Sequence, residues 1–167
     1  MTFYGGLVGG VLTFLLGFYL VIKKKNPEVG IIKDIFPIAP ACITIAHAFG
    51  RIGCFFAGCC YGIETTSWLG IKFPNTINAV YPTQLFEALF LFILTAILFY
   101  LAYKKRNIYN LSIYLASYGI FRFLLEFLRG DNRGAYILNL SPSQWFSIIA
   151  IISSVVLLFL MKKRRIN

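Results

Sequence analysis

Charge is what this sequence has least of. Charged residues make up only 13% of its 167 residues, whereas 59% are hydrophobic, and the mean hydropathy is +0.76. Soluble domains have roughly 25% charged residues, and a soluble surface this apolar would precipitate. The scarcity of charge therefore excludes a soluble protein. It predicts an all-α fold, a multi-pass bundle of transmembrane helices.

Acidic residues and histidine are scarcer still. There are six Asp and Glu against 16 Lys and Arg, with one His, so the net charge is +10. This excess does not indicate nucleic acid, because the positive residues follow apolar stretches in short runs, as in the positive-inside pattern of membrane proteins. The runs are Lys23–Lys25, Lys104–Arg106 and Lys162–Arg165. The predicted partner of these charges is the lipid bilayer.

Convincing internal repeats are lacking, and the length is too short for a transporter with two repeated halves. One integral membrane domain, residues 1–167, is predicted. Five segments approach the roughly 20 apolar residues that a spanning helix needs. They are Tyr4–Ile22, Ile35–Ala57, Gln84–Tyr103, Ser112–Leu128 and Ser143–Met161. The first lacks the positive n-region of a signal peptide, so it is predicted to be retained.

The second segment is predicted to be irregular, because two prolines and two glycines interrupt it, and Ser141-Pro142-Ser143 is typical of a helix start. Alternating the spans brings 11 of the 16 Lys and Arg to one side. By the positive-inside rule that side is cytoplasmic. The N-terminus is then outside and the C-terminus inside. The connections Gly58–Pro82 and Arg129–Pro142 share the outer face.

Two arginines, Arg51 and Arg122, lie inside apolar segments. A guanidinium keeps its proton, so at membrane depth it needs an anion or a water-filled cavity. Arg122 shares one helix face with Tyr118, Glu126 and Arg129, at spacings of four, four and three. This stripe is either a structural ion pair or an anion-binding groove. The groove is favoured because both arginines approach the same outer side.

His47, Arg51 and Cys54 also share a face, at spacings of four and three. Gly50 and Gly53 beside them are predicted to leave backbone amides free for a phosphate, which in a bilayer belongs to a phospholipid. His47 is either a packing residue or a base.

The four cysteines include Cys54, Cys59 and Cys60 in a C-x4-C-C arrangement. It matches no standard zinc spacing and has no histidine nearby, so no metal is predicted. These cysteines are either small packing residues or partners in a disulfide from Cys59 or Cys60 to Cys54. At the start of the third span, Thr83 is a predicted cap. Glu87 either complements the helix dipole or faces the groove.

Five blocks of the sequence resemble, in order, the signatures of the prolipoprotein diacylglyceryl transferases. They are FYGGLVGG (Phe3–Gly10), GRIGCFFAGCCYG (Gly50–Gly62), YPTQLFEA (Tyr81–Ala88), YGIFRFLLEFLRGD (Tyr118–Asp131) and LSPSQW (Leu140–Trp145). The resemblance implies a bacterial plasma-membrane enzyme that transfers the diacylglyceryl group of phosphatidylglycerol to the lipobox cysteine of a prolipoprotein signal peptide. Glycerol phosphate is released, and no cofactor is expected.

The same resemblance implies roles for individual residues. Catalytic roles fall on Tyr118, Arg122, Glu126 and Tyr4. Substrate-binding roles fall on Arg51, Arg122, Gly5, Gly6, Gly53, Cys54 and Gly62. Both arginines would hold the phospholipid headgroup.

The chain differs from the family pattern at the positions expected to activate the thiol. Tyr4 and Tyr81 stand where the pattern has His, and Cys54 and Cys59 replace Asn and Glu. About two further spans normally precede the point where this chain starts. His47 is a candidate replacement base. The alternatives are a transferase with another acceptor, a non-catalytic paralogue that binds phospholipid or lipoprotein, and a thiol-redox membrane protein.

Overall fold

The computed structural model describes the chain except for residues 1, 29, 31–34, 106, 130–139 and 167. The chain divides into two compact units, Met1–Phe36 and Pro37–Asn167. They are described one at a time.

The first unit is helical over the whole predicted first span. Helix α1 (Thr2–Gly17) continues into a π-helical turn, η1 (Phe18–Ile22), and then into the short helix α2 (Lys23–Lys25). Phe18 is buried, and its ring packs against those of Phe14 and Tyr19. The helix at Tyr4–Ile22 is thus confirmed, whereas its passage through a membrane stays a prediction.

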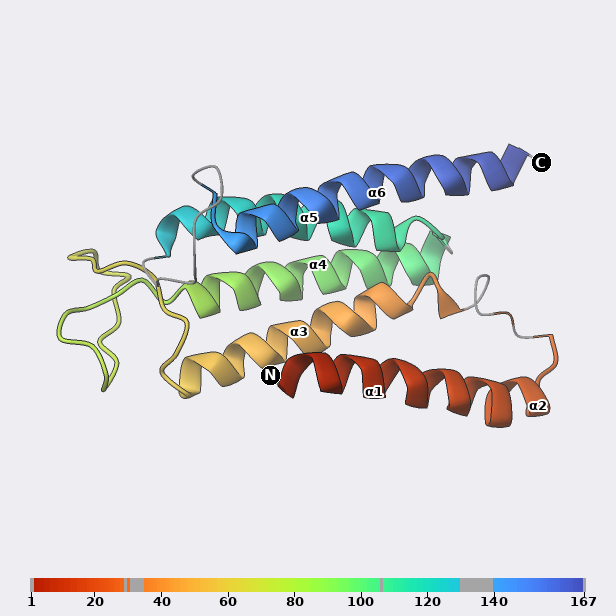
Figure 1. Ribbon diagram of the computed structural model, residues 1–167, viewed down its shortest axis with the longest axis horizontal. Coiled ribbons are helices and arrows are strands. Elements are labelled where there is room, and N and C mark those ends of the chain that lie inside the picture. The colour runs from red at the N-terminus through yellow and green to blue at the C-terminus, as the bar shows by residue number, and fades with distance from the viewer. Residues whose placement is uncertain (1, 29, 31–34, 106, 130–139, 167) are drawn as a thin grey trace. The chain divides into compact units, whose positions relative to one another are not determined.

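The second unit is a bundle of four long helices (Figure 1). They are α3 (Ala39–Phe56), α4 (Thr83–Lys105), α5 (Asn110–Leu125), extended by a 3-10 turn η3 (Glu126–Leu128), and α6 (Pro142–Ile166). Helix α3 packs on α4, α4 on α5, and α5 on α6. The predicted all-α fold is confirmed.

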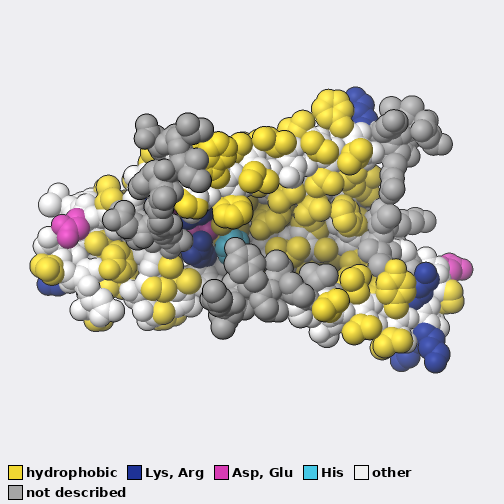
Figure 2. Space-filling model, in the orientation of Figure 1, with side chains coloured by type: hydrophobic (Ala, Val, Ile, Leu, Met, Phe, Trp, Pro, Cys, Tyr) yellow, Lys and Arg dark blue, Asp and Glu magenta, His cyan; other side chains and the backbone are white. Residues whose placement is uncertain are grey.

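Among the described residues, four helical segments are long and apolar enough to cross a membrane: Ala39–Phe56, Thr83–Lys105, Asn110–Leu128 and Pro142–Lys162. They match four of the five predicted spans. On α4, the exposed side chains of Leu89, Ile93 and Ile97 recur every four residues, so they form one apolar stripe. Figure 2 shows hydrophobic side chains over much of the visible face. Such surfaces are stable against lipid and costly in water, so the chain is a multi-pass membrane protein.

Helix α3 is continuous, so the predicted irregularity at Pro40, Gly50 and Gly53 is wrong. Pro37, in contrast, lies in a turn before the helix, so the start of the predicted span is irregular as expected. Pro40 lies in the first turn, where its missing N–H breaks no helical bond. Gly50 and Gly53 lie inside the helix, so their amides belong to its hydrogen-bond ladder rather than to an anion-binding loop. A Cβ added at either position would meet no described atom within 4 Å. These glycines therefore leave the helix surface open.

Helix α6 begins where Ser141-Pro142-Ser143 predicts. The Ser141 hydroxyl accepts a bond from the Gln144 amide at 3.3 Å, and the Gln144 side chain accepts one from the Ser141 amide at 2.9 Å. This is a reciprocal capping box, followed by proline at the first helical position. It fixes the start of α6 against the end of α5, because the Ser141 hydroxyl also donates to Glu126 Oε1 at 2.8 Å.

Candidate functional site

Glu87 lies at the centre of a polar cluster formed by three helices of the bundle. Its side chain, on α4, is fully buried, and its Oε1 lies 3.0 Å from Arg51 Nη2 of α3. Tyr118 of α5 donates its hydroxyl to the same oxygen at 2.8 Å. An ionised carboxylate buried this deeply is stable only when paired and hydrogen-bonded, and both conditions are met here. Glu87 therefore faces the groove, which settles the alternative that the sequence left open.

His47 lies beside this cluster. Its Nε2 is 3.7 Å from Glu87 Oε1, and its ring packs edge-on against that of Tyr118, with 5.0 Å between the ring centroids. The side chain is 27% exposed, so it reaches the boundary of the cluster rather than its interior. His47 is thus neither a plain packing residue nor isolated from charge.

A second polar cluster lies around Arg122, one helical turn from Tyr118. Arg122 Nη2 is 2.9 Å from Glu126 Oε2 and donates to the hydroxyl of Ser143, at the start of α6, at 3.2 Å. Both charged side chains are about nine-tenths buried. The predicted stripe is therefore present from Tyr118 to Glu126, whereas its fourth member, Arg129, follows the 3-10 turn with extended backbone and does not continue the helix face. Its members have different partners: Tyr118 donates a hydrogen bond to Glu87 of α4, whereas Glu126 forms an ion pair with Arg122.

Each arginine keeps one buried N–H without a hydrogen-bond partner among the described residues: Nε of Arg51 and Nη1 of Arg122. The second carboxylate oxygen of Glu87, Oε2, is likewise buried and unpartnered there. An unsatisfied buried donor or acceptor costs about 1–3 kcal/mol, more when charged. The two clusters thus carry unused capacity to donate to an anion and to accept a proton.

A cavity of about 160 Å³ lies between α5 and α6, and Tyr118, Arg122, Ser143 and Phe146 are among its lining residues. That is the volume of about five water molecules. It suffices for a phosphate-sized group but not for the acyl chains of a lipid. The acyl chains would have to lie on the apolar helix surfaces outside.

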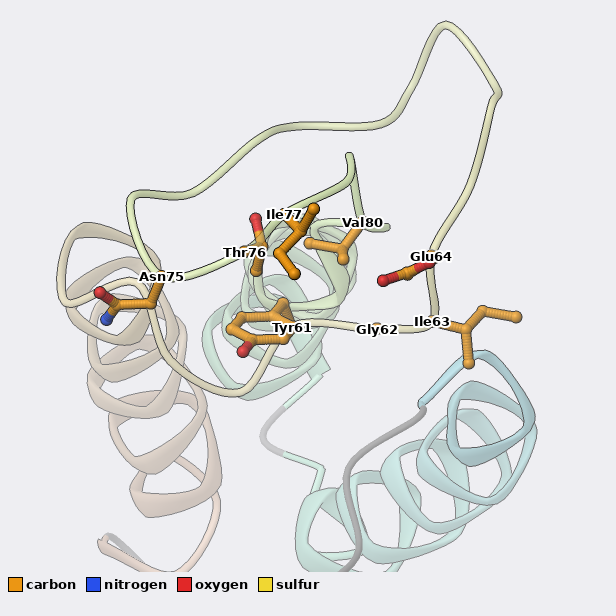
Figure 3. A pocket seen from close by; sticks show the side chains of 8 residues that line it. All are labelled: Tyr61, Gly62, Ile63, Glu64, Asn75, Thr76, Ile77 and Val80. Atoms are coloured by element: carbon orange, nitrogen blue, oxygen red, sulfur yellow. The ribbon is translucent and has the colours of Figure 1, made fainter.

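The connection between α3 and α4 forms a separate and larger pocket of about 520 Å³. Figure 3 shows Tyr61 below Thr76, Ile77 and Val80, with the Glu64 side chain turned toward them. The lining contains a carboxylate but no Lys or Arg. Of these two cavities, only the one between α5 and α6 offers a guanidinium to an anion.

Comparison with known proteins settles the family. The family model described as prolipoprotein diacylglyceryl transferase matches residues 1–160. The chain belongs to this family.

Curated relatives of the transferase family cover most of the chain. A phosphatidylglycerol–prolipoprotein diacylglyceryl transferase of Clostridium tetani is 39% identical over 155 residues, which are 89% of this chain and 59% of that protein. One of Clostridium perfringens, numbered 2, is 41% identical over 160 residues, 92% of this chain and 59% of that protein. One of Finegoldia magna is 37% identical over an alignment of 172 positions, which covers 100% of this chain and 64% of that protein. The chain thus spans about three fifths of the length of these relatives. No solved structure matches it.

Four of the residues to which the family resemblance assigns a role meet in the second unit. Arg51 and Tyr118 share Glu87, and Arg122 and Glu126 form the neighbouring pair. Glu87 itself was missing from the predicted site. A signal for it exists in the sequence, because Glu87 precedes the buried Leu91, Leu94 and Leu98 of α4 at helical spacing and so lies on the buried face.

Other predicted site residues lie elsewhere or stay predictions. Tyr4, Gly5 and Gly6 are on α1, in the first unit, and their surroundings lie outside the described part of the structure. Gly53 is within α3. Gly62 lines the pocket of the α3–α4 connection, where a Cβ would come within 2.5 Å of the Leu128 carbonyl oxygen. Gly62 is required by close packing, whatever its role toward substrate.

Cys54 joins Cys59 and Cys60 rather than the charged cluster. The three sulfur atoms lie within 4.8 Å of one another, and none of the four cysteines forms a disulfide. The packing interpretation is wrong for Cys59, which is exposed. Desolvation, followed by hydrogen bonding with the Cys60 thiol, raises the pKa of Cys59 from its ordinary 9.0 to about 11. The predicted cap is also wrong, because Thr83 is the first residue inside α4, where the Phe86 amide donates to the Pro82 carbonyl, and the Thr83 hydroxyl donates to the Cys60 carbonyl at 3.0 Å.

Proposed function

We propose that this chain carries the phospholipid-binding and transfer site of a diacylglyceryl transferase. On this proposal it moves the diacylglyceryl group of phosphatidylglycerol to the lipobox cysteine thiol of a prolipoprotein signal peptide. The proposal rests on the two buried arginines. Each is paired with a glutamate, and each has a buried donor nitrogen that is unpartnered among the described residues. Family membership supports the same activity.

The arginines supply the anion site. A guanidinium makes charge-assisted bonds to phosphate oxygens, and at low dielectric such bonds are stronger than in water. Arg122 presents its group to the cavity between α5 and α6, and Arg51 approaches Tyr118 from α3. As the phosphate becomes a leaving group its negative charge increases. Donors fixed before the reaction therefore stabilise the transition state more than the bound lipid.

The reaction is a displacement at the glycerol carbon that bears the phosphate. The acceptor sulfur forms a C–S bond, the C–O bond to the phosphate breaks, and glycerol phosphate departs with the electron pair. The thiol proton needs a base, and we assign it to the pair of His47 and Glu87, whose Oε2 is unpartnered among the described residues. Tyr118 holds Glu87 through Oε1. Tyr4 remains a second candidate for a role at the thiol.

The membrane placement follows the charge pattern. On the positive-inside rule, the basic runs at Lys23–Lys25, Lys104–Arg106 and Lys162–Arg165 face the cytoplasm of a bacterial plasma membrane. The connection between α3 and α4 then faces outward. The acceptor cysteine would reach the site from that side.

The test is a transfer assay with the purified chain, labelled phosphatidylglycerol and a lipobox peptide. Labelled peptide and released glycerol phosphate should appear in equal amounts. Arg51→Lys keeps the charge but loses the planar fork of donors, so turnover should fall by roughly 100-fold or more. The control is Lys72→Gln, which removes an exposed cation from the α3–α4 connection and should leave turnover unchanged.

The outcomes separate the alternatives. Label on the peptide that is lost in Arg51→Lys supports the transferase. Glycerol phosphate released without labelled peptide points to another acceptor. Lipid binding without any turnover, in a protein that retains its helix content, contradicts catalysis and leaves a non-catalytic relative.

A further inference from the structure

Three cysteines at and just beyond the end of α3 form a cluster to which the proposed transfer step assigns no chemical role. The sulfur atoms of Cys54, Cys59 and Cys60 all lie within 4.8 Å of one another. A metal ion bound to thiolates at about 2.3 Å brings its sulfur ligands to about 3.8 Å from one another. The thiols are therefore near ligand spacing, and side-chain movements that shorten the S–S separations by up to about 1 Å would complete it.

The backbone brings two adjacent cysteines to one point. In an extended chain the side chains of neighbouring residues point to opposite sides. Here Cys60 adopts a left-handed conformation, φ 65°, and Gly58 does the same with φ 61°. Cys60 is the one non-glycine residue with positive φ in the described part of the chain. This turn lets Cys59 and Cys60 approach Cys54 together, which explains why the C-x4-C-C spacing did not predict a site.

Buried side chains of α4 hold the turn in place. Gln84 donates to the Cys59 carbonyl at 2.6 Å, and Thr83 donates to the Cys60 carbonyl at 3.0 Å. Both side chains are at most 1% exposed. The Cys59 amide donates back to the Cys54 carbonyl at 3.2 Å. The sulfur atoms are thus positioned by bonds to the backbone rather than by the cysteines alone.

We propose that Cys54, Cys59 and Cys60 form a three-thiolate site for a thiophilic d10 metal ion, Cu⁺ or Zn²⁺. Soft thiolate ligands select these ions over Mg²⁺, Ca²⁺ and Mn²⁺, which prefer oxygen. No fourth His, Cys or carboxylate joins the group within the described residues. Three sulfur ligands suffice for Cu⁺, whereas Zn²⁺ needs water as a fourth ligand, so Cu⁺ should bind more tightly. The exposed Cys59 gives the ion access.

The experiment measures metal binding on the full chain in detergent micelles, reduced and kept free of oxygen. Cu⁺ and Zn²⁺ are titrated separately against a chelating dye, and Cd²⁺ serves as a probe of thiolate coordination through its charge-transfer absorption. Wild-type protein should bind one ion per chain. Loading should protect three of the four thiols from alkylation. Cys54→Ser, Cys59→Ser and Cys60→Ser should each weaken binding at least tenfold.

Cys42→Ser is the matched control, because Cys42 is an exposed cysteine on α3 outside the cluster. Its affinity for the metal should equal that of wild type. Equal losses in Cys42→Ser and Cys59→Ser would overturn the proposal, since binding would then be unspecific. Failure of the reduced wild-type protein to bind either Cu⁺ or Zn²⁺ would overturn it too. Metal binding is measured independently of lipid transfer. A failure of the metal-site proposal is therefore distinguishable from a failure of the proposed function.

Discussion

The pair of Glu87 and Arg51 allows a quantitative test of how the helices are held together. Replacing Glu87 by Gln keeps the size of the side chain and an oxygen for the Tyr118 hydroxyl, but it removes the charge 3.0 Å from Arg51. The Glu87 side chain is fully buried and that of Arg51 is 15% exposed, so solvent screens the pair little. Breaking a buried pair by removing one partner costs about 3–5 kcal/mol, because the other charge stays buried and uncompensated.

Removing both charges should cost far less than the sum of the single changes. We expect Glu87→Gln and Arg51→Gln each to lower the free energy of unfolding by about 3–5 kcal/mol. The double variant should recover about 2–3 kcal/mol of the combined loss, which is the coupling expected for side chains in contact. The free energy of unfolding is measured by titrating SDS into mixed micelles and following the helical circular dichroism signal.

The matched control is Glu64→Gln, which removes an exposed carboxylate from the α3–α4 connection. Its effect should stay within about 0.5 kcal/mol. If the losses in Glu87→Gln and Arg51→Gln add to within about 0.5 kcal/mol in the double variant, the two groups are not coupled. The description of Glu87 as the centre of the cluster would then be refuted.

Further predictions concern close packing, the start of α6 and the second ion pair. Gly62→Ala should destabilise by about 1–3 kcal/mol, because its Cβ would lie 2.5 Å from a backbone oxygen. Gly53→Ala, on open helix surface, should instead stabilise by about 0.5–1 kcal/mol. Ser141→Ala should cost about 2–3 kcal/mol, because it removes both the helix cap and a bond to a carboxylate. All three are measured by the same unfolding titration. Glu126→Gln removes a negative charge beside Arg122 that would repel a phosphate, so phosphatidylglycerol should bind several-fold more tightly in equilibrium titrations. Unchanged or weaker binding by the folded variant would show a purely structural pair.

The membrane helices could be predicted from the sequence because bilayer thickness alone sets their length. Helices α4 and α6 coincide with the predicted spans to within a few residues at their starts, since an apolar run and a helix-start signal are both local. The predicted interruption of α3 was wrong because it depends on where the helix begins, which no local signal gave. A proline interrupts a helix only in its interior, and Pro40 lies in the first turn. Composition does not show where the first turn is.

The candidate site could be predicted only in part, because the contacts of Glu87 join residues of different helices. The spacing of Tyr118, Arg122 and Glu126 places them on one face of α5, and the structure agrees. That spacing does not reveal that Tyr118 reaches Glu87 on α4. The thiol cluster was missed for a related reason, since it depends on a left-handed residue, Cys60, whose conformation sequence spacing does not encode.

The two glutamates explain how two arginines can remain inside apolar helices when no lipid is bound. A lone guanidinium in this environment would be strongly destabilising, and each is neutralised by a carboxylate within about 3 Å. Complete satisfaction of every donor would leave nothing to recognise a ligand. The pairs instead leave Nε of Arg51 and Nη1 of Arg122 unpartnered among the described residues. On the proposed function, a phosphate that binds Nη1 of Arg122 therefore need not displace Glu126, so this ion pair can persist when lipid enters.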